Sequence, residues 1–121
     1  MDKILINDLL VRCIIGVNED ERRNTQDVVI NIVLSADLHT PGRTDRLEDT
    51  VNYSALKKRI VAETEQSHFY LVEALAERIA DLCLAEPMVQ QAQVTVEKPA
   101  ALRFARSVGV VITRDRNLES P

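Results

Sequence analysis

The sequence predicts an α+β fold in which two helices cover one face of a four-stranded antiparallel sheet. The spacing of its apolar residues changes along the chain in the order strand, strand, helix, helix, strand, strand. Two hairpins that flank a helix pair pack most simply as one helical layer on one sheet. The length of 121 residues suits one modest core, so we expect a single domain over residues 1–121.

The first hairpin is predicted from two alternating segments on either side of a polar stretch. The first strand covers residues 3–17, in which Gly16 is expected to allow a bend or a close backbone approach. Residues 18–26 form a polar connection, and the second strand covers residues 27–38. Residues 39–49 have Pro-Gly turn chemistry and are predicted to be a loop. One parity of the second strand is apolar and indicates a buried face: Val28, Ile30, Ile32, Leu34 and Ala36.

The helix pair is predicted from apolar residues that recur every three or four positions. The first helix begins near Asn52 or Tyr53 and ends near Gln66, and Asn52 is a suitable N-cap. The second helix covers about residues 71–85, and Pro87 stops it. The expected buried positions are Leu56, Ile60 and Thr64 in the first helix and Leu71, Leu75, Ile79 and Leu82 in the second.

Two further strands are predicted at residues 91–98 and 107–114, and the tail at 117–121 is expected to be frayed. A sheet of such long strands has two open edges, which favour pairing with other chains. Joining the edges of neighbouring copies would close the sheet into a barrel. We therefore expect a ring-shaped homo-oligomer.

Composition and charge narrow the class of protein. Hydrophobic residues make up 45% of the chain and charged residues 28%, as is typical of a globular domain. The net charge of -4, the lack of a basic run and the few aromatic residues argue against a nucleic-acid surface. No apolar run reaches the roughly 20 residues that span a bilayer, and the N-terminus does not resemble a signal peptide. We expect a cytoplasmic protein with no membrane partner.

The cysteines and histidines do not suggest a metal centre. Cys13 and Cys83 lie in apolar stretches and are expected to be buried thiols. His39 and His68 are far apart and lack the spacing of zinc ligands. We therefore predict no metal, and we expect no other cofactor.

Lys98 stands where an alternating strand predicts an apolar residue. It shares the parity of Val94 and Val96, and Pro99 follows it. An amine among apolar neighbours loses hydration, which favours its neutral form and allows proton exchange. The alternative is a lysine at the rim of the sheet, whose stem lies on apolar surface and whose head reaches water.

Three further side chains combine useful chemistry with a simple structural explanation. Glu73 either complements the dipole of its helix or offers two oxygens to paired N–H donors of a planar heterocycle. Tyr53 either packs as an aromatic staple beside the N-cap or provides a phenol for proton transfer. Glu21 belongs to an acidic cluster with Glu19 and Asp20, for which a solvated loop is the simplest interpretation.

Four motifs resemble one enzyme family. They read GVNEDERRNTQDVVINI, GRTDRLEDTVNY, LVEALAERIA and VEKPAALRFARSVGV. In this order, over about residues 4–114, they resemble the dihydroneopterin aldolase family of the tunnelling (T-fold) enzymes. The resemblance implies the ββααββ T-fold unit, tetrameric rings that often stack as octamers, and active sites between subunits.

The resemblance also implies a reaction and residue roles. The family cleaves 7,8-dihydroneopterin in a retro-aldol reaction to 6-hydroxymethyl-7,8-dihydropterin and glycolaldehyde, in folate biosynthesis, without a metal or a Schiff base. Lys98 matches the general acid/base, and Glu21 matches a glutamate near it and near the substrate hydroxyls. Tyr53 matches a tyrosine, from a neighbouring subunit, that mediates proton transfer to the enol intermediate. Glu73 matches the anchor of the pterin 2-amino group and N3–H, in a pocket lined by Val51, Leu71 and Val72.

The main activity remains open between close relatives. The segments ALRFARSVGV and QDVVINI also resemble dihydroneopterin triphosphate 2′-epimerases, which break the same carbon–carbon bond but recombine the fragments. Lys98-Pro99 favours the aldolase pattern, whereas Arg103 and Arg106 would suit a triphosphate, unless they are simply solvated. A non-catalytic pterin-binding module is a third hypothesis, which the presence of Lys, Tyr and Glu at the three positions disfavours.

Overall fold

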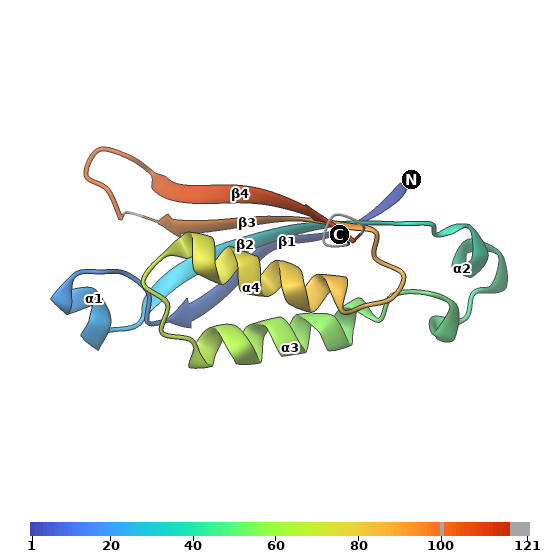
Figure 1. Cartoon of the computed structure of the whole chain (residues 1–121), viewed down its shortest axis with the longest axis horizontal. Coiled ribbons are helices and arrows are strands. Elements are labelled where there is room, and N and C mark those ends of the chain that lie inside the picture. Colours follow the sequence, from blue (N-terminus) through green and yellow to red (C-terminus); the bar gives the residue numbers. More distant parts are fainter. Residues whose placement is uncertain (100, 117–121) are drawn as a thin grey trace, which may run out of the picture.

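The computed structural model describes residues 1–99 and 101–116, and it has the predicted α+β order (Figure 1). Its sheet is antiparallel throughout, with the strand order β1-β2-β3-β4. Helices α3 and α4 cover one face of this sheet. The principal elements are β1 (Asp2–Cys13), β2 (Gln26–Ala36), α3 (Tyr53–Gln66), α4 (Val72–Leu84), β3 (Gln91–Pro99) and β4 (Ser107–Asp115).

The core lies between the helical layer and the sheet. The predicted parity of β2 is buried, with each of its five apolar side chains at most 1% exposed. The three predicted positions of α3 are buried as well, and so are Leu75, Ile79 and Leu82 of α4. Leu71 was predicted wrongly, since it is the N-cap residue of α4 and is 52% exposed. Each fully buried leucine or isoleucine contributes about 1.5–3 kcal/mol, so this layer provides most of the stability.

The first strand ends at Cys13, earlier than the predicted residue 17. Gly16 has a φ of +133°, a backbone conformation that residues with a side chain rarely adopt. Its N–H donates to the carbonyl of Phe69 at 3.2 Å. The residues after Cys13 therefore turn toward the α3–α4 connection and leave the ladder with β2.

Both segments that were predicted as irregular contain short helices. The connection between β1 and β2 includes α1 (Glu19–Arg23), with acidic residues in its first turn and basic residues in its last, which complement the helix dipole. The predicted loop 39–49 contains α2 (His39–Thr44) and a 3-10 turn, η1 (Leu47–Asp49). Helix α2 ends where Asp45 adopts a left-handed conformation and donates its N–H to the carbonyl of Pro41.

The two cysteines are free and buried, as predicted. Burial raises the pKa of both thiols, and it raises that of Cys83 to about 12. The predicted frayed tail falls on residues 117–121 and lies outside the described residues. Within the described part of the chain, no helix is long and apolar enough to cross a membrane.

The candidate residues from the sequence analysis come from two ends of the molecule (Figure 1). One end holds α1, the tip of β3 and the start of α4, and we call it the Lys98 end. The opposite end holds α2, η1 and the start of α3, and we call it the Tyr53 end. This separation arises because α3 and α4 are antiparallel and run the length of the sheet.

Candidate active site

Lys98 is the penultimate residue of β3, and its amine meets a carboxylate. Val94 and Val96 precede it on the same face and are fully buried, as the alternation predicts. The Lys98 side chain is only 12% exposed, and Nζ donates to Glu21 Oε2 at 2.6 Å. The lysine head is therefore neither unpaired among apolar groups nor free in water.

The carboxylate of Glu21 is held by several groups besides Lys98. Its Oε2 also accepts from Gln26 Nε2 at 3.3 Å, and its Oε1 accepts from the backbone N–H of Asn18 at 3.2 Å. A Cβ added to Gly16 would overlap this carboxylate, so the glycine makes room for it. The hydrogen bond from Lys98 is the largest cause of a lowered pKa at Glu21, against a smaller opposing effect of burial. Glu21 is therefore an ionised partner of the lysine at neutral pH.

Gln26 is a site residue that sequence reasoning missed. Its Nε2 donates both to the carbonyl of Ile15, at 2.6 Å, and to Glu21. The sequence placed Gln26 at the end of a polar connection, where a glutamine needs no special explanation. Its role depends on the close approach of residues 15, 21 and 26 in space, for which no local pattern provides a signal.

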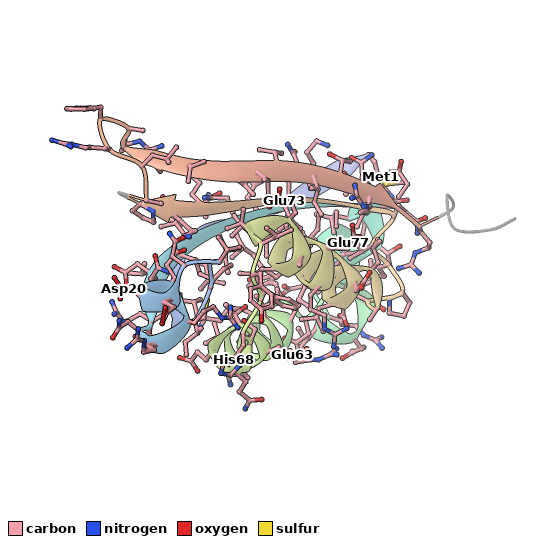
Figure 2. All side chains as sticks on the ribbon, turned by 60° about the vertical axis from the view of Figure 1, so that its left-hand side comes forward. Met1, Asp20, Glu63, His68, Glu73 and Glu77 are labelled. Atoms are coloured by element: carbon pink, nitrogen blue, oxygen red, sulfur yellow. The ribbon has the colours of Figure 1, made fainter. Side chains whose placement is uncertain are left out.

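The start of α4 brings a second carboxylate to the Lys98 end. Glu73 lies in the first turn of α4 and is exposed. Figure 2 shows it at the start of the helix, beneath β3 and β4, with Asp20 of α1 at the same end of the molecule. Within residues 1–99 and 101–116, its carboxylate makes no ion pair or side-chain hydrogen bond, so both oxygens are open to a ligand. Leu71 beside it is 52% exposed and Val72 is half-buried.

Tyr53 lies at the other end of the molecule, as the first residue of α3. Asn52 is the predicted N-cap, and its Oδ1 accepts from the N–H of Ala55 at 3.0 Å. The Tyr53 ring is 57% exposed, whereas Val51 is 2% exposed and belongs to the core. One chain therefore does not bring Tyr53 to Lys98, and the Val51 side chain offers a ligand little surface.

The structure separates the two arginines that the sequence treated alike. Arg106 donates to Glu97 Oε2 at 3.0 Å, and the hydroxyl of Ser107 donates to the same oxygen at 2.7 Å. These bonds lower the pKa of Glu97, the Ser107 bond most strongly. Arg103 is exposed, with its guanidinium 5.2 Å from the ring centre of Phe104, and it makes no ion pair within the described residues. Arg103 is thus the more available of the two for an anion.

An ion-paired lysine beside a helix start with an open carboxylate is a suitable arrangement for binding a polar small molecule and moving its protons. A family model described as dihydroneopterin aldolase matches residues 4–113. The chain therefore belongs to the dihydroneopterin aldolase family.

Relatives of the chain carry more than one activity in their names. A dihydroneopterin triphosphate 2′-epimerase of Pseudomonas aeruginosa is 36% identical over 116 residues, 96% of this chain and 94% of that protein. A folic acid synthesis protein of Dictyostelium discoideum is 42% identical over 94% of this chain, which spans only 17% of that protein's length. The solved structure of Escherichia coli dihydroneopterin aldolase in complex with neopterin has a TM-score of 0.90 and 32% identity, with 94% of this chain and 99% of that chain covered. Identity alone does not separate the aldolase from the epimerase.

Proposed function

We propose that the chain is a 7,8-dihydroneopterin aldolase that acts as a single T-fold domain over residues 1–121. It would cleave its substrate to 6-hydroxymethyl-7,8-dihydropterin and glycolaldehyde. The observation that carries the proposal is the 2.6 Å pair between Lys98 and Glu21, part-buried beside Gly16 at the end of β3. A lysine held in this way is a positioned proton carrier.

Glu73 is the proposed anchor of the pterin ring. Its two oxygens match the adjacent donors of the ring, the 2-amino group and N3–H, in a charge-assisted pair of hydrogen bonds. Leu71 and Val72 provide apolar surface beside it. The neopterin in the solved relative supports a ligand of this class. At Val51, the contact with the ring would come from the backbone, because the side chain is in the core.

The proposed chemistry is a proton relay around one carbon–carbon bond. The pair of Lys98 and Glu21, with the lysine in its neutral amine form, takes the proton of the substrate 2′-hydroxyl, and the bond between C1′ and C2′ breaks. Glycolaldehyde leaves, and the electron pair moves into the dihydropterin ring as an enol forms at C1′. The enol then takes a proton at C1′ through Tyr53, which yields the hydroxymethyl group. The proton lost from the hydroxyl equals the proton gained at carbon, so the reaction needs no further reactant.

We propose that Tyr53 comes from a neighbouring subunit of a homo-tetramer or homo-octamer. The exposed ring of Tyr53 and its distance along the molecule from Lys98 support this assignment. Strands β1 and β4 are the two sheet edges, and pairing them between copies would close a ring. Two free buried thiols fit a reducing compartment, which supports a cytoplasmic location.

An epimerase of dihydroneopterin triphosphate is the second candidate. Arg103, five positions beyond Lys98, is exposed and has no acidic partner within the described residues, so it is available for a phosphate. The full-length match to an epimerase at 36% identity supports the same reading.

A product assay tests the proposal. Purified protein is incubated with 7,8-dihydroneopterin and, separately, with its triphosphate, and the products are resolved by chromatography. Glycolaldehyde with 6-hydroxymethyl-7,8-dihydropterin as main products is the expected result. Dominant conversion to the 2′-epimer, above all from the triphosphate, would replace the aldolase with the epimerase. Tight pterin binding without turnover would instead support a non-catalytic binding module.

A further inference from the structure

Helix α1 carries Glu21 but has no core of its own. It is five residues long, Glu19–Arg23, and none of its residues is buried. A helix this short is unstable in isolation, because nucleation costs more than one turn of hydrogen bonds returns. Side-chain contacts must therefore hold it, and with it Glu21, against the rest of the molecule.

Besides the pair between Glu21 and Lys98, Arg22 provides a second set of such contacts. Its Nη1 donates to the carbonyls of Gly16 and Phe69, both at 3.1 Å. Its Nη2 donates to the carbonyl of His68 at 2.7 Å. The guanidinium also lies 4.0 Å from the ring centre of Tyr70, in a cation–π arrangement. The planar guanidinium of Arg22 thus donates to three backbone carbonyls, one in the β1–β2 connection and two in the α3–α4 connection.

These bonds join the two segments that carry the site. Gly16 belongs to the connection between β1 and β2, which includes Glu21. Residues 68–70 belong to the connection between α3 and α4, which leads to Glu73 two residues after Leu71. The N–H of Gly16 donates to the same Phe69 carbonyl that accepts from Arg22, so a backbone hydrogen bond also joins the two connections at this point.

We propose that Arg22 is a positioning residue, which fixes Glu21, and through it Lys98, relative to the pterin anchor Glu73. The three hydrogen bonds by which Arg22 joins the two connections are called the Arg22 clamp. The catalytic part of this inference rests on the proposed function, whereas the clamp itself does not. Within the described residues, Arg22 makes no hydrogen bond or ion pair with Lys98 or Glu73, so it acts by holding α1, which carries Glu21. Lysine would not replace it, since a single ammonium group cannot bond three separated carbonyls in one plane.

The neighbouring arginine is a matched control. Arg23 is on the same helix and carries the same charge, but its side chain is 67% exposed. Among the residues that the structure describes, it pairs only with Glu19, which is 89% exposed. Such surface pairs contribute little. Arg22 and Arg23 therefore have the same charge and helix, and they differ in that Arg22 contacts the backbone carbonyls and the Tyr70 ring.

The test compares Arg22→Ala, Arg22→Lys and Arg23→Ala in the full chain. Amide hydrogen exchange over residues 18–24 reports on the clamp without any need for turnover. Both Arg22 variants are expected to speed this exchange and to lower kcat on the order of 10- to 100-fold, as small misplacements of catalytic groups do. Neopterin affinity should stay close to that of the unchanged protein, because α4 is anchored in the core. Arg23→Ala should behave like the unchanged protein in all three measurements.

Several results would overturn the assignment. Unchanged hydrogen exchange in Arg22→Ala would show that Arg22 does not hold α1. Faster exchange with unchanged kcat would show that holding α1 does not position the catalytic groups. If Arg22→Ala does not fold, Arg22→Lys, which keeps the charge and the stem, decides by the same measurements. If the unchanged protein turns over neither pterin, the proposed function fails, while the exchange data still decide whether Arg22 holds α1.

Discussion

The Lys98 end and the Tyr53 end of this small domain are built in opposite ways. At the first, Lys98 and Glu21 are 12% and 21% exposed and share hydrogen bonds with Gln26 and the backbone. At the second, Tyr53 is 57% exposed, and its hydroxyl has no hydrogen-bond partner within the described residues. One end is thus pre-organised within the chain, whereas the other offers a side chain that a second molecule would have to use.

The difference follows from how each end is made. At the Lys98 end, a hairpin connection folds back so that residues 77 positions apart in sequence meet at 2.6 Å. At the Tyr53 end, α3 begins, and its N-cap Asn52 accepts a hydrogen bond from the N–H of Ala55 in the first turn. Pre-organisation of a side chain needs contacts with distant segments. Lys98 has such a contact with Glu21, whereas the Tyr53 hydroxyl has none within the described residues.

Removing the amine at the Lys98 end should have the largest effect. Lys98→Ala is expected to lower kcat on the order of 1000-fold while neopterin affinity is largely retained, because general acid–base catalysis is lost and the ring anchor is not. Steady-state kinetics and calorimetry measure the two quantities. Lys58→Ala, at an exposed position of α3, is the control. A near-normal kcat in Lys98→Ala would leave the lysine with a structural role only.

Removing Glu73, the proposed ring anchor, should affect binding next most strongly. Glu73→Ala is expected to weaken neopterin binding on the order of 100- to 1000-fold, since two hydrogen bonds to a charged acceptor are lost. Calorimetric titration measures the change, with Glu65→Ala of α3 as an exposed control. Unchanged affinity would refute the anchor and leave Glu73 as a helix-dipole residue.

Mixing variants tests whether the two ends meet between subunits. Tyr53→Phe alone should lower kcat on the order of 100-fold, because a proton donor to the enol is lost. After unfolding and refolding together with an equal amount of Lys98→Ala, about a quarter of the shared sites would carry both native residues and recover activity. No recovery in a mixed oligomer, or a monomer by light scattering, would contradict a site between subunits.

Filling the space at Gly16 should disturb the Lys98 end more mildly. Gly16→Ala introduces a Cβ that overlaps the Glu21 carboxylate, at a backbone conformation unfavourable for alanine. We expect kcat to fall roughly 10-fold and stability to fall by about 1–3 kcal/mol. Gly42→Ala is the matched control, because its added Cβ meets nothing within 4 Å. Equal kcat values in the two variants would show that the position of Glu21 is not critical.

The pH dependence of stability gives the smallest expected effect. The pKa of Glu21 is lowered in the folded state, chiefly by Lys98, from an ordinary value of 4.5. Its stabilising contribution is therefore fully present above that value and is lost as the pH falls through the lower folded pKa. Chemical denaturation from pH 7 to pH 3 should show the stability difference between the unchanged protein and Glu21→Gln shrinking with acid. A difference independent of pH would mean that the ion pair does not contribute to stability.

The sequence by itself determined the four strands, the two long helices and the buried faces of β2 and α3. Alternation in β2 and helical spacing in α3 depend on local geometry, because each residue type favours a buried or exposed position whatever lies across the core. The same alternation identified Lys98 as unusual, and apolar neighbours predicted the burial of Cys13 and Cys83. Glu73 and Tyr53 were candidates from their positions at helix starts, and the family resemblance gave them and Glu21 their expected roles.

Only the tertiary structure decided how these residues are arranged. It paired Lys98 with Glu21, added Gln26 and the Arg22 clamp, and placed Tyr53 at the start of α3, away from the tip of β3. It also formed α1 from a stretch that looked like a polar loop, and left Leu71 exposed at the N-cap of α4. Periodicity records the side on which a residue lies, but a hydrogen bond between distant segments depends on how their connections pack, and no local pattern encodes that.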